Sequence, residues 1–336
     1  GELRIDGQFL SRYQFTHVLF QEYLYRRMTV SERRLLHGEV AAVLEGLYGG
    51  QTAEIVAQLA YHYTEGGQTE KAIEYILRAG ERSRLAYANE DAIVYFSRVL
   101  ELLSHSKILP VRNREGAWRL EALKGLGQVY YRTGQIADAK EVFQEAITLG
   151  REMGLAPREL VRLYYWLGEV ANWQDRYNDL SRIGEEGLLL LEDDTESTEA
   201  ALMNQHIACG HLNAGNLIKF REFSHRTAQF LMRLPYSEEL RPAYLQMSEL
   251  YVLDKKVEQA MRWLRALEQE ATQLHDLQAL GLVSLRIGSI LGRTGDFYGV
   301  IRQTQQALKR FTQTGDAKHE GECLLLIGET LLFLGD

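Results

Sequence analysis

The sequence predicts an all-α fold, a solenoid built from consecutive helix hairpins. Three observations predict it. A short pattern of a large apolar residue followed by a small one recurs about every 40 residues. Apolar residues inside each half of the repeat lie three or four positions apart, which is the helical period. The 336 residues include only 4 prolines, so long helices can run without interruption.

The repeat is anchored by a small residue that follows a large aliphatic residue or methionine. The first step between these small residues is 41 positions, and the other four steps are 40 each. We expect the small side chain to let a second helix approach closely. The six positions are Gly127, Gly168, Ala208, Ser248, Gly288 and Gly328.

A turn position follows each small residue by seven places. Glycine occupies four of these positions, and glycine readily adopts the left-handed conformation that ends a helix. Each repeat is therefore predicted to form a helix, a tight turn and a second helix. The six turn residues are Gly134, Asp175, Gly215, Lys255, Gly295 and Gly335.

This pattern resembles the tetratricopeptide repeat, and the first unit carries it most clearly. The matching residues there are Leu126, Gly127, Tyr130, Gly134, Ala139, Phe143 and Ala146. The resemblance implies a right-handed superhelix whose first helices line a concave binding surface. The usual period of that family is 34, so the period of 40 predicts longer helices or longer linkers.

We divide the chain into three parts. Residues 1–48 precede the repeats, residues 49–104 form irregular first helix pairs, and residues 105–336 form the regular array with a truncated last repeat. The last half-repeat leaves an apolar face without a partner helix, so we expect the natural protein to continue.

The first 48 residues predict a hairpin followed by two helices. Residues 3–9 alternate apolar and polar side chains around Asp6-Gly7, a two-residue hairpin signal. Residues 13–25 predict a helix, and Ser31 is the expected N-cap of the next one. The predicted apolar face of that next helix consists of Leu36, Val40, Val43, Leu44 and Leu47.

Residues 1–104 resemble the end of the ATPase module in STAND-class signalling proteins, such as large LuxR-type and cyclase-linked regulators. In that family a winged helix ends in an aromatic-x-His-x-Leu helix, and a further helix and Leu-Ala-x-His-Tyr repeats follow. The matching residues are Phe15, His17, Leu19, Glu22, Tyr25, Arg33, Arg34, His37, Leu44, Glu45, Leu59, Ala60, His62, Tyr63, Ala72, Tyr75, Ala79 and Gly80.

This resemblance implies a winged-helix remnant at the N-terminus and a nucleotide-driven switch in the complete protein. His17 takes the place of a histidine that can contact the nucleotide phosphates in that family. The chain has no G-x-x-x-x-G-K-[ST] motif, so ATP or ADP is expected only in an ATPase domain outside it, and we expect no cofactor here. A bacterial regulator of transcription or of another effector is the expected context.

Composition excludes several classes of function. The 38 basic and 46 acidic residues give a net charge of −8, which argues against direct nucleic-acid binding. No apolar run is long enough for a transmembrane helix, and two distant cysteines suit the cytoplasm. His206, Cys209 and His211 lie close in sequence, but no fourth ligand is visible, so we expect no metal site. No pattern of catalytic residues stands out, and we expect no enzyme activity.

The functional face is expected on the first helices of the repeats, by analogy with tetratricopeptide arrays. Aromatic and polar residues combine there, as they often do at recognition surfaces. In the competing interpretation, the long helices bury these aromatics against the next repeat. The candidate residues are Lys124, Gln128, Tyr131, Arg132, Arg162, Tyr165, Glu169, Asn172, Trp173, Gln205 and Asn213.

Two functional hypotheses follow. In the first, the chain is the sensor and protein-interaction arm of an ATP-dependent regulator and binds a protein, peptide or small ligand on the concave face. In the second, the array is an autoinhibitory or oligomerisation scaffold without an external ligand. The identity of the ligand and of the effector domain is not encoded in these residues.

Overall fold

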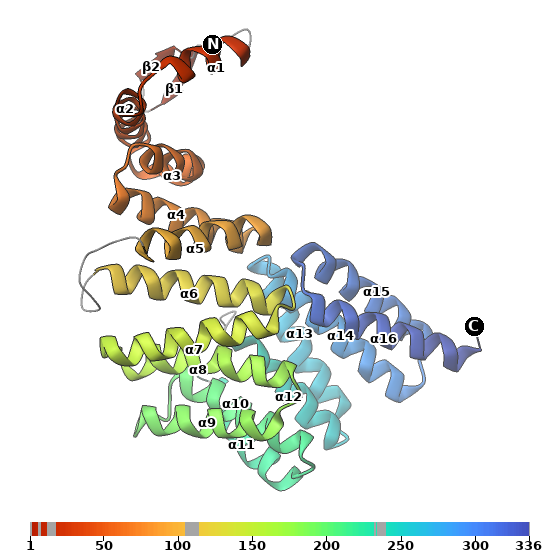
Figure 1. Ribbon diagram of the computed structural model, residues 1–336. Coiled ribbons are helices and arrows are strands. Elements are labelled where there is room, and N and C mark those ends of the chain that lie inside the picture. The colour runs from red at the N-terminus through yellow and green to blue at the C-terminus, as the bar shows by residue number, and fades with distance from the viewer. Residues whose placement is uncertain are drawn as a thin grey trace. The chain divides into compact units, whose positions relative to one another are not determined.

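The computed structural model describes residues 2–5, 8–11, 18–104, 114–231, 233 and 240–335, and these residues are almost entirely helical (Figure 1). The chain divides into two compact units, Gly1–Gly125 and Leu126–Asp336. No helix among the described residues is both long and apolar enough to span a bilayer.

The N-terminal unit begins with a β-hairpin and continues as helices. Strands β1 and β2 pair antiparallel, with Leu3 opposite Leu10, which confirms the predicted hairpin. The elements are β1 (Glu2–Ile5), β2 (Gln8–Ser11), α1 (Val18–Arg27), α2 (Val30–Tyr48), the 3-10 helix η1 (Gly49–Ile55), α3 (Val56–Glu65), α4 (Thr69–Leu85) and α5 (Asn89–Ser104).

Helix α2 begins two residues earlier than the sequence predicts. The Thr29 hydroxyl accepts a hydrogen bond from the Glu32 backbone N–H at 3.2 Å. The Glu32 carboxylate in turn accepts one from the Thr29 backbone N–H at 2.7 Å. These reciprocal bonds form a capping box, so the prediction of Ser31 as N-cap is wrong.

The buried face of α2 also differs from the prediction. Leu36 and Val43 are exposed, whereas His37 and Ala41 are buried. The buried His37 makes a polar contact with α3, in which its Nδ1 lies 2.9 Å from His62 Nδ1.

The C-terminal unit consists of repeated helix pairs. Helix α6 runs into it from the N-terminal unit, and the residues that join α11 to α12 are only partly described. The helices are α6 (Arg114–Arg132), α7 (Ile136–Met153), α8 (Pro157–Trp173), α9 (Tyr177–Leu191), α10 (Thr198–Asn213), α11 (Leu217–Leu231), α12 (Arg241–Leu253), α13 (Val257–Gln273), α14 (Leu277–Thr294), α15 (Phe297–Thr314) and α16 (Ala317–Leu334).

All six predicted turn residues adopt positive φ angles. The glycines have φ between 76° and 88°, and Asp175 and Lys255 have φ of 55° and 59°. Each of them ends the first helix of its repeat, which confirms the predicted hairpins. At Asp175 and Lys255 this conformation costs about 1–2 kcal/mol of backbone strain, which glycine avoids.

The small residues at positions 127 and 168 allow close helix packing, as predicted. A Cβ atom added at Gly127 would lie 2.7 Å from Cζ of Phe143, which belongs to the second helix of the same repeat. One added at Gly168 would lie 2.4 Å from the His206 ring on the next first helix. Phe143 is fully buried with Ala139 in the core between α7 and α8.

The first helices of successive repeats, α6, α8, α10, α12, α14 and α16, contact one another within the C-terminal unit. Side-chain hydrogen bonds connect several of them at sequence separations of 37 or 38 residues. The row of first helices curls back on itself. This is seen in the contact of Lys318 on α16 with the Trp173 ring on α8, where Nζ lies 5.5 Å from the ring centroid. We call the surface enclosed by this row the inner face.

Candidate functional site

The inner face is organised around the carboxylate of Glu169 on α8. Its Oε2 accepts a hydrogen bond from the Tyr131 hydroxyl of α6 at 3.1 Å. Its Oε1 is hydrogen-bonded to Nε2 of His206 on α10 at 3.0 Å. Three repeats therefore converge on one carboxylate, whose side chain is only 12% exposed.

The surroundings keep this carboxylate ionised. Burial alone raises the pKa of Glu169, but the hydrogen bond from His206 and the positive charge of Lys318 lower it below its ordinary value. Burial and the neighbouring Glu169 charge raise the pKa of Tyr131 well above 10. The phenol therefore remains a hydrogen-bond donor at neutral pH.

Aromatic rings fix the network in place. Tyr165 stacks on His206 with ring centroids 5.0 Å apart and planes nearly parallel. The ring of Tyr131 meets Trp166 and Trp173 edge to face, at 5.8 and 5.7 Å. Such pairs favour one arrangement of the rings.

Unpartnered acceptors lie beside the network. Gln205 on α10 and Gln246 on α12 are both more than nine-tenths buried, and the Oε1 atom of each has no hydrogen-bond partner. The two residues are neighbours, since Gln246 Nε2 donates to the Gln205 carbonyl oxygen at 3.4 Å. Nδ1 of the fully buried His206 is also unpartnered. Each such atom costs about 1–3 kcal/mol until a ligand or water supplies its partner.

A half-buried thiol lies in this region without adding a nucleophile. Cys209 of α10 lies 3.8 Å from Oδ1 of Asn172 on α8. Burial raises the pKa of Cys209 to about 11. The thiol is therefore protonated at neutral pH, and the arrangement is suited to binding rather than to thiolate chemistry.

Six of the residues predicted from the sequence lie in or beside this network: Tyr131, Tyr165, Glu169, Asn172, Trp173 and Gln205. The aromatic ones are packed more tightly than expected. Tyr165 is 8% exposed, and Gln205 is 7% exposed. The interpretation that long helices bury the aromatics is correct for Tyr165, whereas Trp173 remains partly accessible.

The other predicted residues have different surroundings. Arg132 is buried at the end of α6. Arg162 forms an ion pair with the buried Glu199 at 2.7 Å, which joins α8 to α10. Asn213 is exposed at the end of α10 and donates to the Cys209 carbonyl oxygen. Lys124 and Gln128 are half-buried on α6. His17 lies outside the described residues.

Sequence reasoning missed Lys318 and the role of His206. Lys318 joins the site because the row of first helices curls back, and no local pattern encodes that return. His206 stands three residues before Cys209, which suggested only a metal site. In the structure His206 bonds Glu169, Cys209 faces Asn172, and the His211 ring packs against Phe223. Among the described residues, no group of three or more His, Cys, Asp or Glu is arranged to hold a metal ion.

Comparison with known proteins identifies the repeat type. Residues 120–152 match the family model of the tetratricopeptide repeat. A segment of 166 residues is 23% identical to an uncharacterized protein of Rhizobium meliloti (strain 1021), and it covers 49% of this chain but only 16% of that protein. The relative is therefore several times longer than the matched segment.

Solved structures share the fold. The Rap conjugation gene regulator of plasmid pLS20, in complex with the Phr* peptide, superposes with a TM-score of 0.58 at 10% identity and covers 90% of this chain and 96% of its own. A Rap protein complexed with Competence and Sporulation Factor gives 0.55 at 12% identity, covering 94% and 91%. A tetratricopeptide repeat protein from Parabacteroides merdae ATCC 43184 gives 0.52 at 15%, covering 84% and 99%. The chain therefore contains a tetratricopeptide-type repeat region with a helical-solenoid fold.

Proposed function

We propose that this chain is the sensor and protein-interaction arm of a larger, ATP-dependent STAND-type regulator. Its repeats would bind a protein, peptide or small ligand on the inner face, and binding would shift the population of an autoinhibited state. The Rap proteins of similar fold were solved with the Phr* peptide and with Competence and Sporulation Factor, and the first of these favours a peptide among the ligand classes.

The observation that carries the proposal is the set of buried acceptors beside the Glu169 network. Gln205 and Gln246 hold acceptor oxygens without partners, and Lys318 supplies a positive charge next to Trp173. A peptide supplies backbone N–H donors for such acceptors and a carboxylate for the lysine. A bound ligand that reaches these acceptors would supply the partners that they lack.

A thermal-shift screen tests ligand binding directly. The chain is screened against metabolites, nucleotides and a peptide library, because a ligand that binds only the folded state must raise the melting temperature. At a ligand concentration of 100 Kd the stabilisation is about 2.7 kcal/mol. Lys318→Ala should abolish a genuine hit, while Lys309→Ala, on the exposed side of α15, should not change it. A folded chain that no ligand shifts would instead favour an autoinhibitory scaffold.

The ATPase context has a separate test. The proposal rests on the residues that resemble the STAND module, among them His37 and His62, which the structure places in mutual contact. ATP or ADP would then bind a preceding domain, with His17 near its phosphates. Sequencing the gene upstream of the codon for Gly1 checks this, since the reading frame must encode a G-x-x-x-x-G-K-[ST] motif. An upstream frame without it would refute the STAND context and leave the binding proposal intact.

A further inference from the structure

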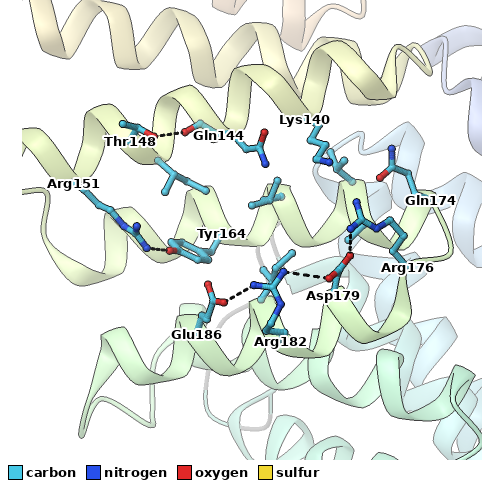
Figure 2. A pocket seen from close by; sticks show the side chains of 15 residues that line it. Lys140, Gln144, Thr148, Arg151, Tyr164, Gln174, Arg176, Asp179, Arg182 and Glu186 are labelled. Atoms are coloured by element: carbon cyan, nitrogen blue, oxygen red, sulfur yellow. Dashed lines mark hydrogen bonds and ion pairs between the residues drawn. The ribbon is translucent and has the colours of Figure 1, made fainter.

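A second concave surface lies on the opposite side of the first helices, between α7 and α9. Helix α8 is recessed between these two second helices and forms the floor of a groove of 480 Å³. Figure 2 shows Lys140, Gln144 and Arg151 of α7 along one wall and Asp179 and Arg182 of α9 along the other. None of these residues belongs to the inner-face network.

The groove is positively charged although the whole chain carries a charge of −8. Four basic side chains and only two carboxylates line it. The carboxylate of Asp179 is paired with Arg176 and with Arg182, and Glu186 pairs with Arg182 at 2.7 Å. Both acidic residues are therefore already neutralised by arginines at or next to α9.

The basic side chains that α7 contributes to the groove have no carboxylate partner of this kind in the described part of the chain. Within the described residues, no carboxylate lies within 4.0 Å of the Lys140 ammonium or of the Arg151 guanidinium. Arg151 instead donates to the Tyr164 hydroxyl, and its guanidinium carbon lies 5.7 Å from the centroid of that ring. The cation is thus held in position by a neutral group, which leaves its charge available to an anion.

The spacing indicates the length of the occupant. Lys140 and Arg151 are 11 residues apart on one helix, which places them on the same side and about 16 Å apart along the axis. A helical partner would need about 11 residues to span that distance. An extended chain spans the same distance with about five residues.

We infer that this outer groove binds an extended acidic peptide segment of a partner protein. Carboxylates four or six residues apart, which lie on the same face of an extended chain, would pair with Lys140 and Arg151. An arginine that is already oriented favours carboxylate recognition, because little side-chain freedom is lost on binding. This site is independent of the inner face and adds a second surface for partner recognition.

Fluorescence anisotropy tests the inference with a labelled octapeptide of alternating glutamate and leucine and a matching lysine–leucine peptide. The groove variant is Lys140→Glu/Arg151→Glu. The matched control is Arg262→Glu/Arg265→Glu on α13, which changes the net charge equally at two exposed arginines of another second helix. Circular dichroism and thermal melting check that both variants are folded.

We expect the acidic peptide to bind and the lysine peptide not to bind. The groove variant should bind the acidic peptide at least about tenfold more weakly, because two ion pairs are lost and repulsion replaces them. The control variant should lose less than about twofold. Equal losses in the two variants would show a general effect of net charge and overturn the inference. Absence of binding to the wild-type chain at millimolar peptide would also overturn it.

Discussion

The carboxylate of Glu45 on α2 is expected to stabilise the packing of the N-terminal unit. It accepts hydrogen bonds from the Tyr75 hydroxyl at 2.6 Å, from Lys71 Nζ at 2.7 Å and from the Tyr63 hydroxyl. Burial alone raises the pKa of Glu45, but the three donors outweigh it and lower the pKa from 4.5 to about 2. The replacement of interest is Glu45→Gln, which keeps the shape and removes the charge.

The stabilisation that the ionised Glu45 contributes follows from the difference between its pKa values in the folded and unfolded states. A pKa of about 2 against 4.5 corresponds to about 3.4 kcal/mol. The Glu45 side chain is 29% exposed, so solvent screening reduces the expected loss to about 2 kcal/mol. Because the unfolded state binds the proton more tightly, this stabilisation is complete above pH 4.5 and is lost as the pH falls toward 2.

Hydrogen exchange measured by mass spectrometry is the assay, since it reports local opening of α2, α3 and α4. Glu45→Gln should speed exchange in these helices about 30-fold at neutral pH, which is the equivalent of 2 kcal/mol. Glu39→Gln is the matched control, because Glu39 is an exposed glutamate on the same helix. Unchanged exchange in Glu45→Gln, or an equal effect in Glu39→Gln, would refute the reasoning.

Three other predictions concern pH, helix packing and turns. Burial lowers the pKa of His62, so the N-terminal unit should lose stability as the pH falls below about 6.5; a melting temperature that rises on acidification from pH 7 to 5.5 would contradict this. Gly127→Ala should lower the free energy of unfolding by about 1–3 kcal/mol, because the new Cβ meets Phe143. Gly328→Ala, at the equivalent position with open space, should be neutral or stabilising by up to about 1 kcal/mol. Equal melting temperatures for the two variants would refute the packing argument. Lys255→Gly should stabilise the chain by about 1 kcal/mol in urea unfolding, since glycine removes the strain of a φ of 59°, and a loss of stability would contradict it.

The repeat architecture was predictable because its signals are local and periodic. The six turn positions all have the left-handed backbone that the sequence pattern predicts, including Asp175, where no glycine marks the turn. The small residue at 127 packs against an aromatic of the following helix, as its spacing predicts. A fixed period carries such information even where single residues depart from the pattern.

The site was only partly predictable because its geometry depends on distant parts of the chain. Glu169, Tyr131 and Asn172 were found from their positions in the repeat. Lys318 joins them only because the row of first helices curls back, an effect of small rotations accumulated over several repeats. The cap of α2 was missed for a local reason, since Thr29 and Ser31 are both good N-caps and only Thr29 has Glu32 three residues later.

The central claim is that the inner face recognises a ligand, and selection from a phage-displayed peptide library on the purified chain tests it most directly. Recovered peptides are compared on the wild-type chain, on Asn172→Ala and Lys318→Ala variants, and on the Lys309→Ala control. Our account predicts an enriched peptide family that binds the wild type and the control but loses at least about tenfold in affinity on either inner-face variant. Peptides that bind all four proteins equally would contradict the claim, and so would a library from which nothing is enriched.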